Sequence, residues 1–144
     1  ARNDNMRKEI ILSKISEIEE SIPLIADNMP EDFEEFENLG LLKDGIYKRI
    51  QYMIENILDI CAIINSDMKF SSPGEEDDII NNLVKNRILS HSIGNKIKEL
   101  KGFRNIIVHR YGRIDDRLSF ELINENLGDF DKIIGSIKKI IENC

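Results

Sequence analysis

The sequence predicts an all-α protein, an up-and-down bundle of four to five main helices. Apolar residues recur at spacings of three and four along most of the chain, and no stretch alternates as a β-strand would. Glycine and proline are scarce, at 8 and 3 of 144 residues, which also favours helices. A chain of this length forms one domain with its own hydrophobic core. We assign residues 6–144 to that domain and leave residues 1–5 outside it, as a foreign remnant or a disordered N-terminus.

Isoleucines define the first predicted helix, which ends before the turn at residues 27–30. They step by four, three, four and three residues and so lie on one helical face: Ile11, Ile15, Ile18, Ile22 and Ile25. A short acidic helix is expected within residues 31–40, because Gly40 is a natural stop.

The next helix is predicted over residues 45–68, and its apolar face is unusually broad. Its main stripe is Ile46, Ile50, Ile54, Ile57, Cys61, Ile64 and Met68, flanked by Met53, Leu58 and Ile60. Such a face indicates burial on two sides, as in the central helix of a bundle.

Residues 69–78 read as a loop, because Pro73 and Gly74 end the previous helix and the acids that follow favour a new one. A short helix to about residue 89 precedes a longer one from about residue 92, with Ser90 or Ser92 as its N-cap. The last helix is amphipathic over residues 116–143, with a kink expected near Gly128.

Composition narrows the functional classes. The net charge of −7 argues against a general nucleic-acid coat protein. The sequence contains no run of about 18 apolar residues, so we expect no membrane span, and no secretory signal is visible in it. Two cysteines make neither a disulfide framework nor a metal site, so we expect a cytoplasmic protein without a bound metal or cofactor.

The charge is unevenly distributed, and residues 96–113 form a basic segment. Six basic residues face one acid there, a net charge of +5, which leaves −12 for the rest of the chain. The segment either contacts phosphate, with Lys101, Arg110 and Arg113 as candidates, or supplies cations that suit a helix C-terminus.

Arg104 lies where a core residue is expected. The stripe of the helix after Ser92, extended at the same spacing, reaches residues 104, 107 and 111. Because an unpaired buried guanidinium is costly, Arg104 has either a carboxylate partner or a position beside a wet cleft or a subunit interface. The central helix offers Glu55 and Asp59, four residues apart, unless these acids simply face solvent.

His109 follows Arg104 by five residues, about 140° around an ideal helix. The two side chains therefore meet only across two subunits, or if the helix loosens before Gly112. A lone histidine there is otherwise a cap, and the isolated His91 is read as structural. Histidine with arginine suits cleavage of RNA through the neighbouring 2′-hydroxyl, in which His109 moves protons and Arg104 neutralises charge.

The segment RNIIVHRY, residues 104–111, fits the pattern R-x4-H-x-Y. The surrounding GFRNIIVHRYGRID, and YMIENILDICAII at residues 52–64, resemble the HEPN superfamily. Within it they are similar to the HepT-like toxins that pair with minimal nucleotidyltransferase (MNT) antitoxins. The resemblance extends from about Met6 onward.

This resemblance implies a HEPN-like bundle and a metal-independent endoribonuclease toxin, active as a homodimer whose two motifs line one cleft. It implies that Arg104 and His109 are catalytic and that Asn105 and Glu55 support them. It further implies that an MNT partner adds AMP to Tyr111 and so silences the toxin.

Two other interpretations remain open at this stage. The chain could be a non-catalytic nucleotide-binding or accessory subunit of a nucleotidyltransferase, which predicts Tyr111 modification without RNA cleavage. A purely structural dimeric bundle explains the periodicity but leaves Arg104, His109 and Tyr111 together by coincidence.

Overall fold

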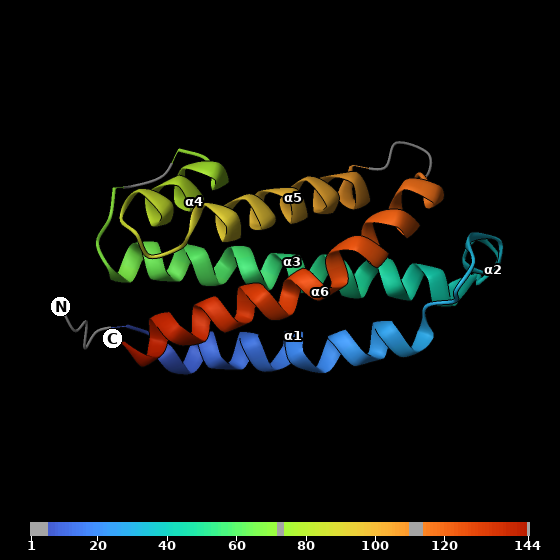
Figure 1. Ribbon diagram of the computed structural model, residues 1–144, viewed down its shortest axis with the longest axis horizontal. Coiled ribbons are helices and arrows are strands. Elements are labelled where there is room, and N and C mark those ends of the chain that lie inside the picture. Colours follow the sequence, from blue (N-terminus) through green and yellow to red (C-terminus); the bar gives the residue numbers. More distant parts are fainter. Residues whose placement is uncertain (1–5, 72–73, 110–113, 144) are drawn as a thin grey trace.

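The computed structural model describes residues 6–71, 74–109 and 114–143 (Figure 1). Within these ranges every regular element is a helix, which confirms the predicted all-α class. The helices are α1 (Lys8–Asn28), α2 (Phe33–Glu37), α3 (Leu41–Asp67), α4 (Glu76–Lys85), α5 (His91–Val108) and α6 (Asp116–Glu142).

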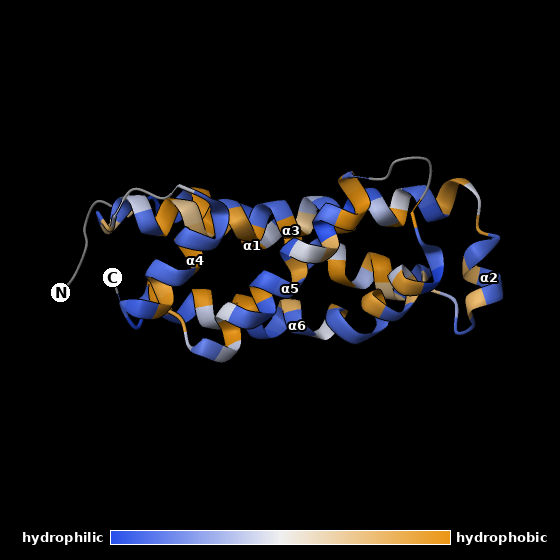
Figure 2. Cartoon of the chain, turned by 90° about the horizontal axis from the view of Figure 1, so that it is seen from above, coloured by the Kyte–Doolittle hydropathy of each residue, from blue (hydrophilic) through white to orange (hydrophobic). Residues whose placement is uncertain are grey.

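Four long helices form the bundle, and they run alternately up and down (Figure 1). Each of α1, α3, α5 and α6 packs against the next, and α6 returns to α1. The shorter α4 lies against α3 and α5. The short α2 lies at one end of the bundle and packs against α6. Hydrophobic and hydrophilic residues alternate along the helices, as an amphipathic bundle requires (Figure 2).

The isoleucine face of α1 and the broad face of α3 are both in the core. Ile11, Ile15, Ile18 and Ile25 are fully buried, and Ile22 packs against the core at its edge. In α3 the whole predicted stripe from Ile46 to Ile64 is buried, with α1, α4 and α5 as its neighbours. The prediction that this helix is buried on more than one side is therefore confirmed.

The helix boundaries differ in detail from those predicted. Gly40 adopts a left-handed φ of 65°, and α3 begins directly after it at Leu41, four residues before the predicted start. Ser90 is the N-cap of α5, since its hydroxyl accepts the backbone N–H of Ile93 at 3.1 Å. The last helix continues without a break past Gly128.

Cys61 is fully buried, and burial raises the pKa of its thiol to about 12. Cys144 lies outside the described residues. Within the described part of the chain, no helix is both long and apolar enough to cross a bilayer.

Gly94 lets α4 and α5 approach closely. A Cβ atom built there would stand 2.6 Å from Cγ2 of Val84, a short β-branched side chain that cannot swing aside. Gly94→Ala is therefore expected to lower the free energy of unfolding by about 1–3 kcal/mol, measured by urea denaturation. Gly128→Ala is the matched control, because a Cβ there meets nothing within 4 Å. It should instead stabilise α6, by about 0.5–1 kcal/mol.

A second variant separates the clash from other effects of the substitution. Val84→Ala in the Gly94→Ala background removes the obstructing methyl group and should recover part of the lost stability. Equal effects of the two glycine substitutions would show that the helix pair is not tightly packed at this point.

Candidate active site at the end of α5

Four of the predicted site residues lie in or directly after the last two turns of α5: Lys101, Arg104, Asn105 and His109. The helix ends at Val108, and His109 is its C-cap residue, with its backbone N–H donating to the Asn105 carbonyl at 2.9 Å. The His109 side chain is exposed. The helix thus ends before Gly112, which is one of the two arrangements expected from the spacing. The predicted site residues Arg110, Tyr111 and Arg113 lie outside the described residues.

The Arg104 side chain is 15% exposed, and two groups hold its guanidinium. Nη2 lies 2.6 Å from Oε1 of Glu76 in the first turn of α4, and Nε donates to Oδ1 of the neighbouring Asn105 at 3.0 Å. The expectation of a carboxylate partner for Arg104 is therefore confirmed. Asn105, predicted to support the catalytic residues, thus contacts Arg104 directly.

The identity of that carboxylate differs from the prediction, which offered Glu55 and Asp59. Asp59 instead pairs with Lys14 of α1 at 3.2 Å, and Glu55 accepts a hydrogen bond from Gln51 at 2.8 Å. Both side chains are thus engaged elsewhere, while the folded-back α4 brings Glu76 to Arg104. The structure does not join Glu55 to the Arg104 group.

Three of the four basic residues that α5 contributes to the basic segment pair with acids on neighbouring helices. Lys96 pairs with Asp129 at 3.2 Å, and Lys101 pairs with Asp77 at 2.8 Å. The hydrogen bond from Lys101 lowers the pKa of the Asp77 carboxyl. Together with Arg104 and Glu76, these pairs show that much of the positive charge of residues 96–109 meets an internal partner.

A second polar cluster fixes the start of α6, directly after the undescribed segment 110–113. Asp116 accepts a hydrogen bond from the Tyr47 hydroxyl at 2.6 Å and from Lys43 Nζ at 2.7 Å. Burial, and then the bond to Asp116, raise the pKa of the Tyr47 phenol. At the preceding residue, the Asp115 carboxylate caps α6 by accepting the Leu118 N–H at 3.1 Å. The start of α6 is thus held by two neighbouring carboxylates, Asp116 through α3 and Asp115 as the cap.

Three side chains that contribute to this region were missed by the sequence reasoning. In the sequence, Glu76 is one of several acids that favour the start of a helix through its dipole. That pattern does not indicate which basic residue Glu76 pairs with. Tyr47 and Lys43 lie four residues apart on one face of α3, and nothing in that spacing indicated Asp116. Within the described ranges, no group of three or more His, Cys, Asp and Glu side chains gathers as metal ligands would.

Comparison with known proteins connects this arrangement to a family. The sequence model of the ribonuclease HepT-like family matches residues 12–137. The chain is similar to the mRNA nuclease HepT of Shewanella oneidensis, with 27% identity over 130 residues, 90% of this chain and 97% of that protein.

Solved structures agree with the sequence match. The tri-AMPylated Shewanella oneidensis HEPN toxin, in complex with MNT antitoxin, superposes with a TM-score of 0.80 at 27% identity, covering 90% of this chain and 97% of that one. A toxin–antitoxin complex with AMP-PNP gives a TM-score of 0.81 at 26% identity, covering 91% and 98%.

Proposed function

This chain belongs to the ribonuclease HepT-like family, and from that membership we propose that it is an endoribonuclease toxin whose reacting groups are Arg104 and His109. The observation that carries the proposal is that the family match includes the helix end where the candidate residues lie. The family match spans residues 12–137, and within it Arg104 and Asn105 are hydrogen-bonded to each other in the last two turns of α5, whose C-cap residue is His109.

The proposed reaction uses the RNA itself as nucleophile. The 2′-oxygen of one nucleotide attacks the adjacent phosphorus, and the bond from phosphorus to the 5′-oxygen of the next nucleotide breaks. His109 accepts the proton of the 2′-hydroxyl, and a second His109, in a homodimer, supplies a proton to the departing 5′-oxygen. The products are a 2′,3′-cyclic phosphate and a 5′-hydroxyl end, with no water or metal consumed in the step.

Arg104 is proposed to neutralise the charge that builds on the phosphorane-like transition state. In the free chain its guanidinium is already paired with Glu76, whose side chain is 42% exposed. A substrate phosphate therefore competes with this carboxylate, which can turn into solvent. The hydrogen bond from Arg104 Nε to Asn105 limits the orientation of the guanidinium while the phosphate replaces Glu76.

The proposed regulation follows the same chemistry. Tyr111 would receive AMP from a nucleoside triphosphate, with pyrophosphate as the leaving group, in a reaction catalysed by an MNT partner. The structurally similar Shewanella oneidensis toxin is tri-AMPylated and in complex with MNT antitoxin, which supports this pairing. Added phosphates two residues from His109 would repel the RNA backbone and block the cleft. We expect both proteins, and the RNA, in the cytoplasm.

The test is cleavage of a defined RNA by the purified chain in EDTA, with the product ends identified by mass spectrometry. The expected result is a 2′,3′-cyclic phosphate at each new 3′ end, a hydroxyl at each new 5′ end, and no cleavage of the same sequence as DNA, which lacks the 2′-hydroxyl. A chain with both Arg104 and His109 replaced by alanine, purified in parallel, controls for contaminating nucleases.

Intact RNA would contradict the proposal if the chain is folded and mass spectrometry finds Tyr111 unmodified. The accessory-subunit interpretation would then take its place. Its signature is tight binding to a nucleotidyltransferase, and modification of Tyr111, without any nuclease activity.

A further inference from the structure

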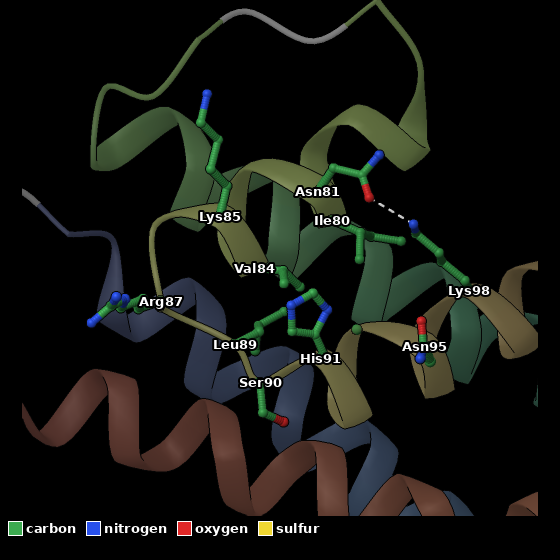
Figure 3. A pocket seen from close by; sticks show the side chains of 11 residues that line it. Ile80, Asn81, Val84, Lys85, Arg87, Leu89, Ser90, His91, Asn95 and Lys98 are labelled. Atoms are coloured by element: carbon green, nitrogen blue, oxygen red, sulfur yellow. Dashed lines mark hydrogen bonds between the residues drawn. The ribbon is translucent and has the colours of Figure 1, made fainter.

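A hollow of about 870 Å³ lies between α4 and the start of α5, at the opposite end of α5 from His109 (Figure 3). Ile80, Val84 and Leu89 form its apolar floor, and Gly94 keeps α5 close to α4 there. The imidazole of His91 stands over this floor (Figure 3). Its size and its apolar base are typical of a small-ligand site.

The rim of the hollow is cationic in an otherwise acidic protein. Lys85 and Arg87 stand on one side, Lys98 on the other, and none of the described residues that line the hollow is acidic. Lys98 donates to Oδ1 of Asn81 at 2.6 Å. Neither Lys85 nor Arg87 makes an ion pair with any residue that the structure describes, unlike Lys101 further along α5.

Arg87 occupies a backbone position that ordinarily favours glycine. It follows the C-cap of α4 with a φ of 60°, and its N–H donates to the Val84 carbonyl at 3.0 Å. The next N–H, of Ile88, reaches the Leu83 carbonyl at 2.8 Å, which completes a Schellman motif. A side chain in this left-handed conformation costs roughly 1–2 kcal/mol relative to glycine. Glycine at position 87 would therefore make the fold more stable, yet the position on the rim holds an arginine.

Lys69 provides the structural comparison. It ends α3 with a φ of 59° and the same pair of hydrogen bonds, from Lys69 N–H to the Ser66 carbonyl at 3.0 Å and from Phe70 N–H to the Asn65 carbonyl at 3.0 Å. Lys69 does not line the hollow. The two residues therefore share charge and backbone geometry and differ in location.

The line of contact between α4 and α5 runs from the hollow to Arg104, which pairs with Glu76 at the start of α4. Lys98 contacts Asn81, and Lys101, one turn further along α5, contacts Asp77, one turn back along α4. His91 and Arg104 are 13 residues apart on the helix, about 20 Å along its axis. An RNA strand crossing Arg104 can therefore reach the hollow several nucleotides away.

We propose that this hollow binds one nucleotide of the RNA substrate at a distance from the cleaved bond. Lys85 and Arg87, which extend in different directions from the rim (Figure 3), contact phosphates of the strand, while the base lies against the apolar floor and His91. This inference rests on the proposed RNA-cleaving function and adds a second contact point for the same strand. The hollow then contributes to the affinity for RNA, in addition to the contacts that the strand makes at Arg104.

The test compares two double variants in the His109→Ala background, so that RNA stays intact. One is Arg87→Gly with Lys85→Ala; the control, Lys69→Gly with Lys132→Ala, removes the same charge elsewhere on the surface. Both glycine changes relieve a left-handed residue and leave the fold intact. Affinity for a labelled ten-nucleotide RNA is measured by fluorescence anisotropy at several salt concentrations.

The expected result is several-fold weaker binding by the hollow variant alone. Its slope of log K against log salt should be smaller by about 0.7 for each phosphate contact removed. Equal affinities and slopes for the two variants would overturn the inference. Binding of AMP by itself, weakened by Arg87→Gly while RNA affinity is unchanged, would also overturn it and identify a site for free nucleotides.

The two proposals fail in different ways in these assays. RNA binding that is sensitive to the hollow variant, without cleavage by the parent chain, would contradict only the ribonuclease proposal. Cleavage together with equal binding by both variants would contradict only the inference about the hollow. Absence of RNA binding by the His109→Ala chain would overturn the inference, whatever the cleavage assay gives.

Discussion

RNA cleavage by the His109→Ala variant is expected to be about 10²–10⁴-fold slower than cleavage by the parent chain, because a positioned general acid–base group contributes that much. His109 is an exposed C-cap residue, so its side chain does not support the core, and α5 keeps its cap hydrogen bond through the backbone N–H. The measurement is the single-turnover rate on a defined oligoribonucleotide in EDTA. Circular dichroism checks that helix content is unchanged.

Arg104→Ala is the companion variant, with an expected loss of about 10²–10³-fold if its guanidinium stabilises the transition state. Arg7→Ala is a matched control, because Arg7 also pairs with a carboxylate, Asp67, at 2.8 Å, but beside the start of α1 and the end of α3. Arg7→Ala should retain the parental rate. A His109→Ala chain within tenfold of the parent would rule out His109 as the proton-transfer group.

The fold was predictable because helical periodicity is a local property. The isoleucine steps of α1 and the continuous stripe of α3 are present in the sequence itself, and burial followed them closely. Ser90 could be named as a candidate cap because capping also depends on only a few neighbouring residues. The start of α3 was less certain, since the left-handed Gly40 permits a helix to begin several residues before its apolar stripe.

The partner of Arg104 could not be predicted in the same way. Glu55 and Asp59 were chosen because their spacing placed them on one helical face, but that spacing does not specify which neighbour the face meets. Glu76 reaches Arg104 because α4 folds back over α3 and α5, at a separation that Gly94 permits. The pairing therefore depends on tertiary contacts, which are absent from any short window of sequence.

The cationic hollow was missed for a related reason. His91 had no companions in sequence, and Lys85 and Arg87 lie before the segment that stands out as basic. They come together only because α4 and α5 form a hairpin that brings residues 80–98 around one point. The basic segment, residues 96–113, shows only where basic residues are dense in the sequence. Whether a basic side chain is free to bind a phosphate depends on its partners in the fold. Lys101 and Arg104, inside the basic segment, are both paired with carboxylates.

Ile57→Ala is expected to lower the free energy of unfolding by about 2–5 kcal/mol, the range for removing a large aliphatic side chain from a packed core. Ile57 is 0% exposed at the middle of α3, the helix that contacts α1, α4 and α5 together. The cavity would lie inside the bundle, where neighbouring helices are held by their other contacts and cannot collapse fully into it. Urea denaturation at a fixed protein concentration measures the loss.

Ile10→Ala is the control, since Ile10 of α1 is 46% exposed and its truncation leaves no enclosed cavity. Its effect should stay within about 0.5 kcal/mol of the parent. If Ile57→Ala cost as little as Ile10→Ala, α3 would not be the centre of the core. The site would then lose its physical basis, because the positions of Arg104 on α5 and Glu76 on α4 both depend on packing against this one helix.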